Sequence, residues 1–403
     1  MTYDVERVRA RFPALNRGVA HFDGPGGSQV PDVVAAAISG ALLSPMANRG
    51  RVTEAERISD DHVTTFRQAM ADLLNADERG IVFGRSMTQL TFDFSRTLAK
   101  GWSAGDEIVV SRLDHDANVR PWVYAAAACG ASIRWIDFDP ETAELSPEDV
   151  AGVLSDRTRL VAVTGASNLI GTRPDLKAIG ELVHDAGALF YVDGVHLAAH
   201  APLDVAAIEA DFFACSPYKF FGPHCGVLAG RPELLEELVP DKLAPSSNRI
   251  PERFELGTLP YELMAGSTAA VDFIAELAPA SATGSRRQRV VDSMTAVEEH
   301  EDALRVRIED GVRHLPGITI RSRAPHRTPT LLLTFDQRTN TEAYEYLAKL
   351  GVNAPAGAFY ALEPSRRLGL GDTGGVRVGL APYNNAEDVE RLLEGLARFV
   401  ASP

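Results

Sequence analysis

The stretch GALFYVDGVHLAAHAPLDVAAIEADFFACSPYKFFGPHCG, residues 187–226, decides the fold that we expect for this chain. It contains two short apolar runs, 188–192 and 212–215, which carry aromatic residues and do not alternate with polar ones. Such runs are typical of strands buried on both faces, as in parallel sheets. The first run ends on Asp193, and Lys219 follows shortly after the second. An anionic and a cationic side chain are thus predicted at the carboxyl ends of neighbouring strands, where open α/β sheets bind ligands.

The pairing of Asp193 with Lys219 has a specific chemical interpretation. Pyridoxal phosphate requires a lysine that forms a Schiff base and a carboxylate against its pyridinium nitrogen. The carboxylate keeps this nitrogen protonated, so that the ring can accept the electrons of a substrate carbanion. A buried Asp–Lys ion pair, or two unrelated charges at loop starts, would place the same residues in the sequence, and on the pair alone these alternatives stay open.

Other polar residues also follow predicted strands. A strand at 80–84 leads into a turn and a helix at 89–98, and the amides and hydroxyl at this helix start suit a phosphate. Each residue of this kind, taken alone, is better explained as a helix cap or a loop residue. Together they would gather at one edge of one sheet the groups that a pyridoxal phosphate pocket requires: Thr88, His115, Asn168, Asp193, Ser216 and Lys219.

The length of 403 residues exceeds the usual size of one compact core, so we expect two domains. Residues 21–280 would form a large cofactor-binding domain, and residues 281–403 a smaller α+β domain. Residues 1–20 would pack with the smaller domain. Within the smaller domain we expect strands at 328–335 and 375–379 and helices at 341–350 and 387–400.

Composition excludes several classes of partner. With 40 Lys and Arg against 55 Asp and Glu, the formal charge of −15 disfavours nucleic acid and anionic membranes. No apolar run approaches the length that spans a membrane, and we expect a cytoplasmic protein. The three cysteines Cys129, Cys215 and Cys225 are too few for a disulfide framework, and no His or Cys spacing predicts a metal site.

Four ordered segments give the sequence a family resemblance over nearly its whole length. They are DEIVVSRLDHDANVRPW (106–122), AVTGASNLIGTRPDL (162–176), VDGVH…SPYKFFGPHCGVL (192–228) and VRVGLAPYNNAEDVERLLEGL (376–396). The sequence resembles the class V aminotransferase family and, within it, the cysteine desulfurase-like branch. This resemblance implies the α/β architecture of pyridoxal phosphate fold type I (aspartate aminotransferase-like). It comprises a large domain with a mostly parallel seven-stranded sheet and a smaller α+β carboxyl-terminal domain.

The resemblance also assigns roles to residues. Lys219 would form the Schiff base and move the Cα proton, and Asp193 would pair with the pyridinium nitrogen. Around the cofactor ring it implies His115, stacked on the ring face, and Asn168 near the phenolic oxygen. His196 and Tyr218 stand where desulfurases have a glutamine and a histidine, and we expect both to contact the cofactor. For the phosphate it implies Met87 through its backbone, Thr88 and Ser216. Thr258 would reach the cofactor phosphate of a partner subunit, which implies a homodimer. On the substrate side it implies Arg377, which would clasp the α-carboxylate, together with Asn168 and Tyr360.

Departures from the family pattern shape the functional hypothesis. Desulfurases carry their persulfide-forming cysteine at the position of Tyr360 and an arginine near Pro355, and this chain has neither. The leading hypothesis is therefore an aminotransferase that acts on a small α-amino acid. The alternatives are a C–S β-lyase, and a desulfurase-like activity with a mobile cysteine or an external thiol. A further alternative is a non-catalytic regulator that binds pyridoxal phosphate.

Overall fold

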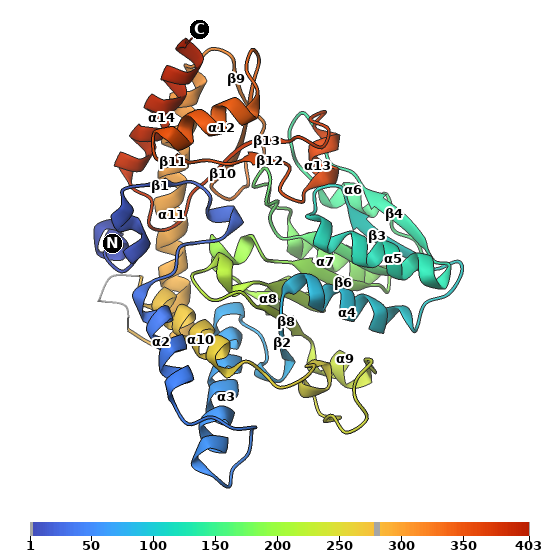
Figure 1. The fold of residues 1–403 in the computed structure, drawn as a ribbon. Helices are drawn as coiled ribbons and strands as arrows, with labels where there is room; N and C mark the ends of the chain where they lie inside the picture. The colour runs from blue at the N-terminus through green and yellow to red at the C-terminus, as the bar shows by residue number, and fades with distance from the viewer. Residues whose placement is uncertain (1–2, 278–282, 403) are drawn as a thin grey trace.

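The computed structural model describes residues 3–277 and 283–402, which are organised around a seven-stranded sheet (Figure 1). In spatial order the strands run β2-β8-β7-β6-β5-β3-β4. Their bounds are β2 (Ile81–Gly84), β3 (Glu107–Ser111), β4 (Ser132–Ile136), β5 (Thr158–Thr164), β6 (Leu189–Asp193), β7 (Phe212–Cys215) and β8 (Gly226–Gly230). Only β8 is antiparallel to its neighbours β2 and β7. The predicted α/β class with a mostly parallel sheet is confirmed.

Strand β6 shows why its apolar residues do not alternate with polar ones. Phe190 and Val192 pack into one hydrophobic core, while Tyr191 between them packs into a second core on the opposite face. Tyr191 meets Trp122 edge to face, with ring centroids 4.8 Å apart. Because helices cover both faces, every residue of the strand's centre is buried.

Helices lie against both faces of this sheet. On the face of Tyr191 lie α4 (Met87–Ala99) and α5 (Arg120–Cys129). On the opposite face lie α3 (Glu54–Leu74), α7 (Leu176–Asp185) and α10 (Tyr261–Ala275). The other helices of this part are α1 (Val5–Arg9), α2 (Asp32–Leu43), α6 (Pro147–Ala151), α8 (Val205–Ile208) and α9 (Pro232–Glu237). Short 3₁₀ helices are η1 (Pro13–Arg17), η2 (Gly24–Gly26), η3 (Glu78–Gly80), η4 (Asp116–Asn118), η5 (Leu197–Ala199), η6 (Pro217–Lys219) and η7 (Glu252–Phe254).

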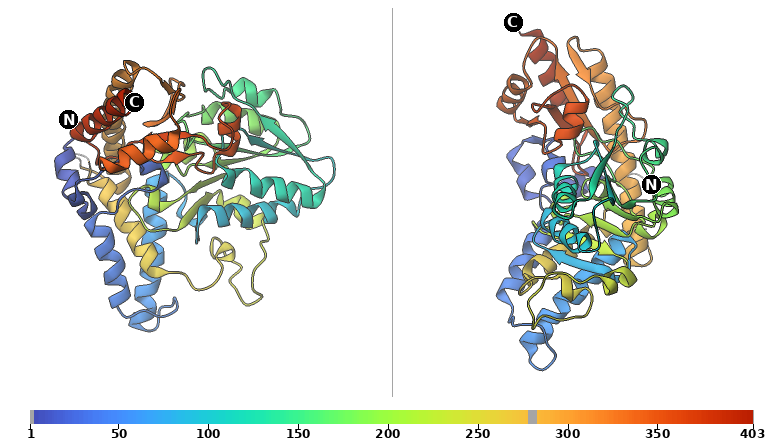
Figure 2. Two further views of the ribbon diagram at one scale, coloured as in Figure 1. Left: turned by 45° about the horizontal axis from the view of Figure 1, so that its top comes forward. Right: turned by 90° about the vertical axis from the view of Figure 1, so that its right-hand side faces the viewer.

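The carboxyl-terminal part has its own sheet and core (Figures 1 and 2). The antiparallel strands run in the order β12-β13-β10-β9. They are β9 (Ile318–Ile320), β10 (Thr330–Phe335), β12 (Ala356–Gly357) and β13 (Gly375–Gly379). The helices are α12 (Asn340–Lys349), α13 (Leu362–Arg367) and α14 (Ala386–Ala401), and the long helix α11 (Arg286–Arg313) joins this part to the large sheet. Strand β10 begins two residues after the start expected at 328.

The amino-terminal segment contacts the carboxyl-terminal part. Strand β1 (Ala20–His21) pairs in parallel with β11 (Val352–Asn353). Arg9 Nη1 lies 2.8 Å from Asp388 Oδ2 at the start of α14. The expected domain boundary at residue 280 lies outside the described residues, so the three-part division stays a prediction. Among the described helices, none is long and apolar enough to cross a membrane.

Candidate active site

A cavity of about 330 Å³ opens at the carboxyl edge of the large sheet. Its walls come from the ends of β5, β6 and β7, the start of α4, the loop around η2, and β13 of the carboxyl-terminal part. Every site residue predicted from the sequence lines this cavity, with the exception of Thr258. They are Met87, Thr88, His115, Asn168, Asp193, His196, Ser216, Tyr218, Lys219, Tyr360 and Arg377.

Lys219 ends the 3₁₀ helix η6, and its amine turns into the cavity. Its Nζ donates a hydrogen bond to the carbonyl oxygen of Pro25 and lies 4.8 Å from the centre of the Tyr218 ring. Burial and the nearby Arg377 lower the pKa of Lys219 to about 7, against the opposing effect of Asp193. A substantial share of the amine is therefore neutral near neutral pH, which is the form that attacks a carbonyl.

Asp193 is the last residue of β6 and is buried. One of its oxygens accepts a hydrogen bond of 2.9 Å from the Val195 amide. Burial raises the pKa of Asp193 to about 6, while the Val195 amide and Lys219 oppose this shift. A protonated ring nitrogen placed beside this carboxylate would supply the cationic hydrogen-bond partner that the carboxylate lacks among the described residues.

The start of α4 forms a cradle for an anion. Ser86 caps the helix by accepting a 3.1 Å hydrogen bond from Gln89, and Met87 and Thr88 are the first helical residues, whose amides have no intrahelical acceptor. Gly226 lies directly against this turn, where a Cβ atom would come within 2.3 Å of the Met87 nitrogen. The close approach therefore requires glycine, and the helix start with the Thr88 hydroxyl suits a phosphate.

Arg377 projects from β13 and is buried. Its Nη1 donates a 3.0 Å hydrogen bond to the Asn168 carbonyl oxygen, and its guanidinium carbon lies 3.7 Å from the centre of the Phe359 ring. Its Nε has no hydrogen-bond partner among the described residues. Burial lowers the pKa of Arg377 to about 9, against the opposing charges of Asp23 and Tyr218. A guanidinium with uncommitted donors is suited to a carboxylate.

The polar side chains around the cavity are held by local contacts. Asn168 donates from Nδ2 to the Phe359 carbonyl at 3.0 Å, which leaves its buried Oδ1 without a partner in the described chain. His115 accepts at Nδ1 from the Ala117 amide at 3.0 Å, and its ring stacks against Tyr360 with centroids 5.7 Å apart. Burial, Lys219 and Arg377 lower the pKa of His115 to about 4, so this imidazole is neutral.

Several contributors to the site carry little signal in the sequence. Pro25 acts through a backbone carbonyl, and Phe359 acts as a ring that covers Arg377. The glycine-rich segment 24–27 does indicate close backbone approach. A Cβ atom added to Gly26 would lie 3.5 Å from Nη2 of Arg377. Phe359 and Tyr360 both adopt left-handed backbone angles, with φ of 52° and 58°. Such angles in consecutive non-glycine residues indicate a constrained functional turn.

Thr258 lies apart from this cavity in its own chain. It is exposed and borders a separate hollow with Arg85 and Gln89, on the outer side of the α4 start. Its predicted contact with a cofactor phosphate requires a second copy of the chain, so it stays a prediction.

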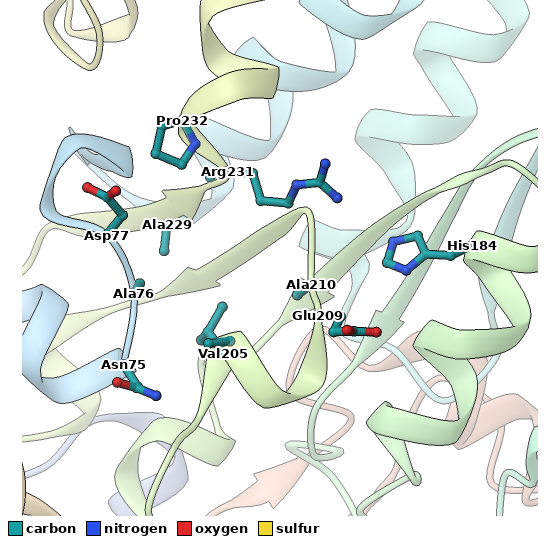
Figure 3. A pocket seen from close by; sticks show the side chains of 12 residues that line it. Asn75, Ala76, Asp77, His184, Val205, Glu209, Ala210, Ala229, Arg231 and Pro232 are labelled. Carbon is teal, nitrogen blue, oxygen red and sulfur yellow. The ribbon is translucent and has the colours of Figure 1, made fainter.

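A different hollow of about 520 Å³ lies at the amino edge of the same sheet (Figure 3). It is bordered by His184 and Arg231, which both contact the buried Asp211. Asp211 accepts hydrogen bonds from His184 Nε2 (3.1 Å), Arg231 Nη1 (2.9 Å) and the Phe190 amide (2.8 Å). Because His184, Arg231 and a backbone amide hold both of its oxygens, the Asp211 carboxylate is part of a structural ion cluster at this edge.

The cavity at the carboxyl edge fits pyridoxal phosphate. Its buried polar atoms without partners in the described chain are Asn168 Oδ1, His196 Nδ1 and Arg377 Nε. An amine, a carboxylate and an anion cradle surround the same space, as the cofactor's aldehyde, ring nitrogen and phosphate require. When bound, the cofactor supplies an electron sink for a carbanion at the substrate Cα. This fold and this site define a pyridoxal phosphate enzyme of fold type I.

The chain belongs to the aminotransferase class-V family, which it matches over residues 20–392. An aminotransferase-like protein of Gibberella zeae is 32% identical over 98% of this chain and 98% of its own length. A cysteine desulfurase of Klebsiella pneumoniae is 32% identical over 99% of each chain. The crystal structure of the cysteine desulfurase CsdA of Escherichia coli superposes with a TM-score of 0.86 at 28% identity, over 99% of this chain and 98% of the other. The predicted family, fold type, cofactor and enzyme class are confirmed.

Proposed function

We propose that the protein is an aminotransferase that acts on a small α-amino acid. The observation that carries this proposal is that the Lys219 amine and the Arg377 guanidinium, whose Nε has no partner among the described residues, share one cavity whose described lining includes no cysteine. Arg377 is suited to the substrate α-carboxylate, and Lys219 to the proton on the substrate Cα. The cavity of about 330 Å³ must hold cofactor and substrate together, which favours a short substrate side chain.

Each residue has a part in this proposal. Arg377 binds and orients the carboxylate, so that the Cα proton points toward Lys219 Nζ. Lys219, with its pKa lowered to about 7, takes this proton near neutral pH and would later donate it to the cofactor carbon. Asp193 holds the proton of the ring nitrogen, and the neutral His115 covers the ring without adding positive charge.

Sulfur chemistry is the second candidate, because the relatives include cysteine desulfurases. A C–S β-lyase uses the same amine and carboxylate and expels a β-substituent. A desulfurase needs an accessible thiolate as well. Cys215 and Cys225 are buried, which raises the pKa of both thiols, and Tyr360 is 77% exposed at the cavity's edge where desulfurases carry their cysteine. These facts favour transamination over desulfuration.

A screen of amino acids against the holoenzyme tests the proposal, with keto acid, sulfide and ammonia assayed in parallel. We expect a keto acid to form in step with amination of an added 2-oxo acid. Ammonia together with a keto acid and no acceptor would instead establish a β-lyase, and sulfide from cysteine would establish sulfur chemistry. If the absorbance of the holoenzyme responds to no amino acid, the remaining hypothesis is a non-catalytic regulator that binds the cofactor.

We also propose a homodimer in which Thr258 completes the partner's phosphate cradle. Exposure of Thr258 and the neighbouring Leu256, which is 47% exposed, supports this arrangement. Subunit mixing tests it. Thr258→Val alone should weaken cofactor binding, and mixing it with Lys219→Ala should restore one intact site per mixed dimer. No recovery on mixing, in protein shown to exchange subunits, would contradict the shared site.

A further inference from the structure

Behind the cofactor pocket, the His196 side chain is held from one side by two threonines. His196 lies on the turn after β6 and lines the cavity, yet is only 3% exposed. Its Nε2 lies 3.0 Å from Thr328 Oγ1 and 3.0 Å from Thr330 Oγ1. Its Nδ1 is buried and has no partner among the described residues. The ring therefore has one committed nitrogen and one that is left for the pocket.

A second imidazole packs against this ring. His200 packs against His196 edge to face, with centroids 4.8 Å apart and planes at 70°. His200 Nδ1 lies 2.9 Å from Glu301 Oε2, and Glu301 is fully buried on α11. Because a carboxylate only accepts hydrogen bonds, Nδ1 of His200 carries the hydrogen, and the rotation of His200 is fixed.

We propose that His200 and Glu301 are positioning residues, which fix the ring orientation and the tautomer of His196 and so tune the cofactor ring beside it. Glu301 locks His200, His200 packs edge to face against the His196 ring, and the uncommitted Nδ1 of His196 is held ready for the cofactor. The inference rests on the cofactor pocket and is independent of whether the reaction is transamination or elimination.

The surroundings make Glu301 the relevant carboxylate for these rings. His196 faces three basic groups, His200, Lys219 and Arg377, and together with burial they hold the pKa of His196 well below its usual range. Glu301 faces His200, the acidic neighbours Glu298 and Asp302, and the hydroxyls of Tyr3 and Tyr383. Burial raises the pKa of Glu301, and His200 opposes this. Glu301 Oε1 has no hydrogen-bond partner in the described chain, so its interaction with His200 is the contact through which it acts.

The chain offers a matched control on the same helix. Glu298 lies one turn before Glu301 on α11 and pairs with Arg173, and no hydrogen bond joins it to His196 or His200 among the described residues. Glu298→Gln and Glu301→Gln remove the same charge with the same isosteric change. An effect that acts through the His196 ring should therefore appear in Glu301→Gln and be absent from Glu298→Gln.

Nitrogen-15 NMR of histidine-labelled, cofactor-free protein reads the ring directly. In the wild type and in Glu298→Gln, we expect the His196 nitrogens at neutral pH to show one tautomer. In Glu301→Gln we expect their shifts to move toward averaged values, because an amide can either donate to or accept from His200 Nδ1 and so no longer selects one tautomer of that ring. Unchanged His196 shifts in folded Glu301→Gln protein would overturn the proposal.

The absorbance of the holoenzyme gives a second measurement. Glu301→Gln should move the pH midpoint of the cofactor's visible band by on the order of half a pH unit, and Glu298→Gln should leave it in place. In a His196→Gln background the effect of Glu301→Gln should vanish, because it acts through that ring. A shift that persists in this background would contradict the relay. If Glu301→Gln does not fold, His200→Gln takes its place with the same expectations.

Discussion

At the carboxyl edge of the large sheet, Asp193 and Lys219 lie in one cavity without a charged hydrogen-bond partner among the described residues. At the amino edge, Asp211 is equally buried, but an arginine, a histidine and a backbone amide hold its oxygens. Strand β6 connects the two edges. It ends at Asp193 on the carboxyl edge, and the backbone amide of its residue Phe190 donates to Asp211 near the amino edge.

The difference separates structural charge from functional charge. A buried carboxylate with several partners contributes to the fold, and removing it leaves its partners unsatisfied. Buried charges without partners cost stability, and they persist where a ligand or a reaction uses them. The two edges therefore predict opposite outcomes for comparable substitutions.

The largest effect is expected from Lys219→Ala at the carboxyl edge. Removing the amine should lower amino-acid-dependent turnover by about 10⁴-fold, since no other described side chain in the cavity supplies a lysine amine. The matched change at the amino edge, Arg231→Ala, should leave turnover per folded molecule within about twofold. Release of keto acid by both variants measures the contrast. Comparable losses in the two would remove the distinction between the edges.

The two aspartates give the next contrast. Asp193→Asn should lower kcat by on the order of 10²-fold, because the anion that stabilises the protonated ring nitrogen is lost. Asp211→Asn should retain kcat but lower the free energy of unfolding by about 1–3 kcal/mol, because one acceptor oxygen is lost to its donors. Steady-state kinetics and urea unfolding separate the outcomes. Full activity in Asp193→Asn would refute its assignment to the ring nitrogen.

Much of this arrangement follows from the sequence alone. Apolar runs without alternation place Asp193 and Lys219 at strand ends, and parallel strands bring those ends to one edge. The two strands and two helices expected in the carboxyl-terminal part also lie close to their observed positions, since their apolar spacing is regular, whereas β9, β11, β12 and α13 are not predicted.

Other features depend on contacts between distant segments. The Pro25 carbonyl that holds Lys219 is a backbone group, which any residue could supply. The Phe359 ring over Arg377 and the contact of His200 with Glu301 join segments whose relative position only tertiary packing decides. The hydrogen-bond partners of Asp211 likewise cannot be predicted from its neighbours in the sequence.

The smallest expected effect is on the stability of the cofactor-free protein. The folded protein lowers the pKa of Lys219 from 10.5 to about 7, so it binds fewer protons than the unfolded chain between these values. Wild-type stability should therefore rise with pH across this window. Lys219→Met lacks this cost and should be more stable than the wild type below pH 7, with the difference fading toward pH 10. Chemical unfolding at several pH values measures it. A pH-independent difference would place the amine outside the low-dielectric cavity.

Reduction of the holoenzyme with sodium borohydride tests the central claim most directly, because it fixes the cofactor to the amine that holds it. Peptide mass spectrometry then locates the modified residue. We predict the cofactor on Lys219, with the label lost in Lys219→Ala and retained in Arg231→Ala. A label on another lysine, or none in protein loaded with pyridoxal phosphate, would contradict the account.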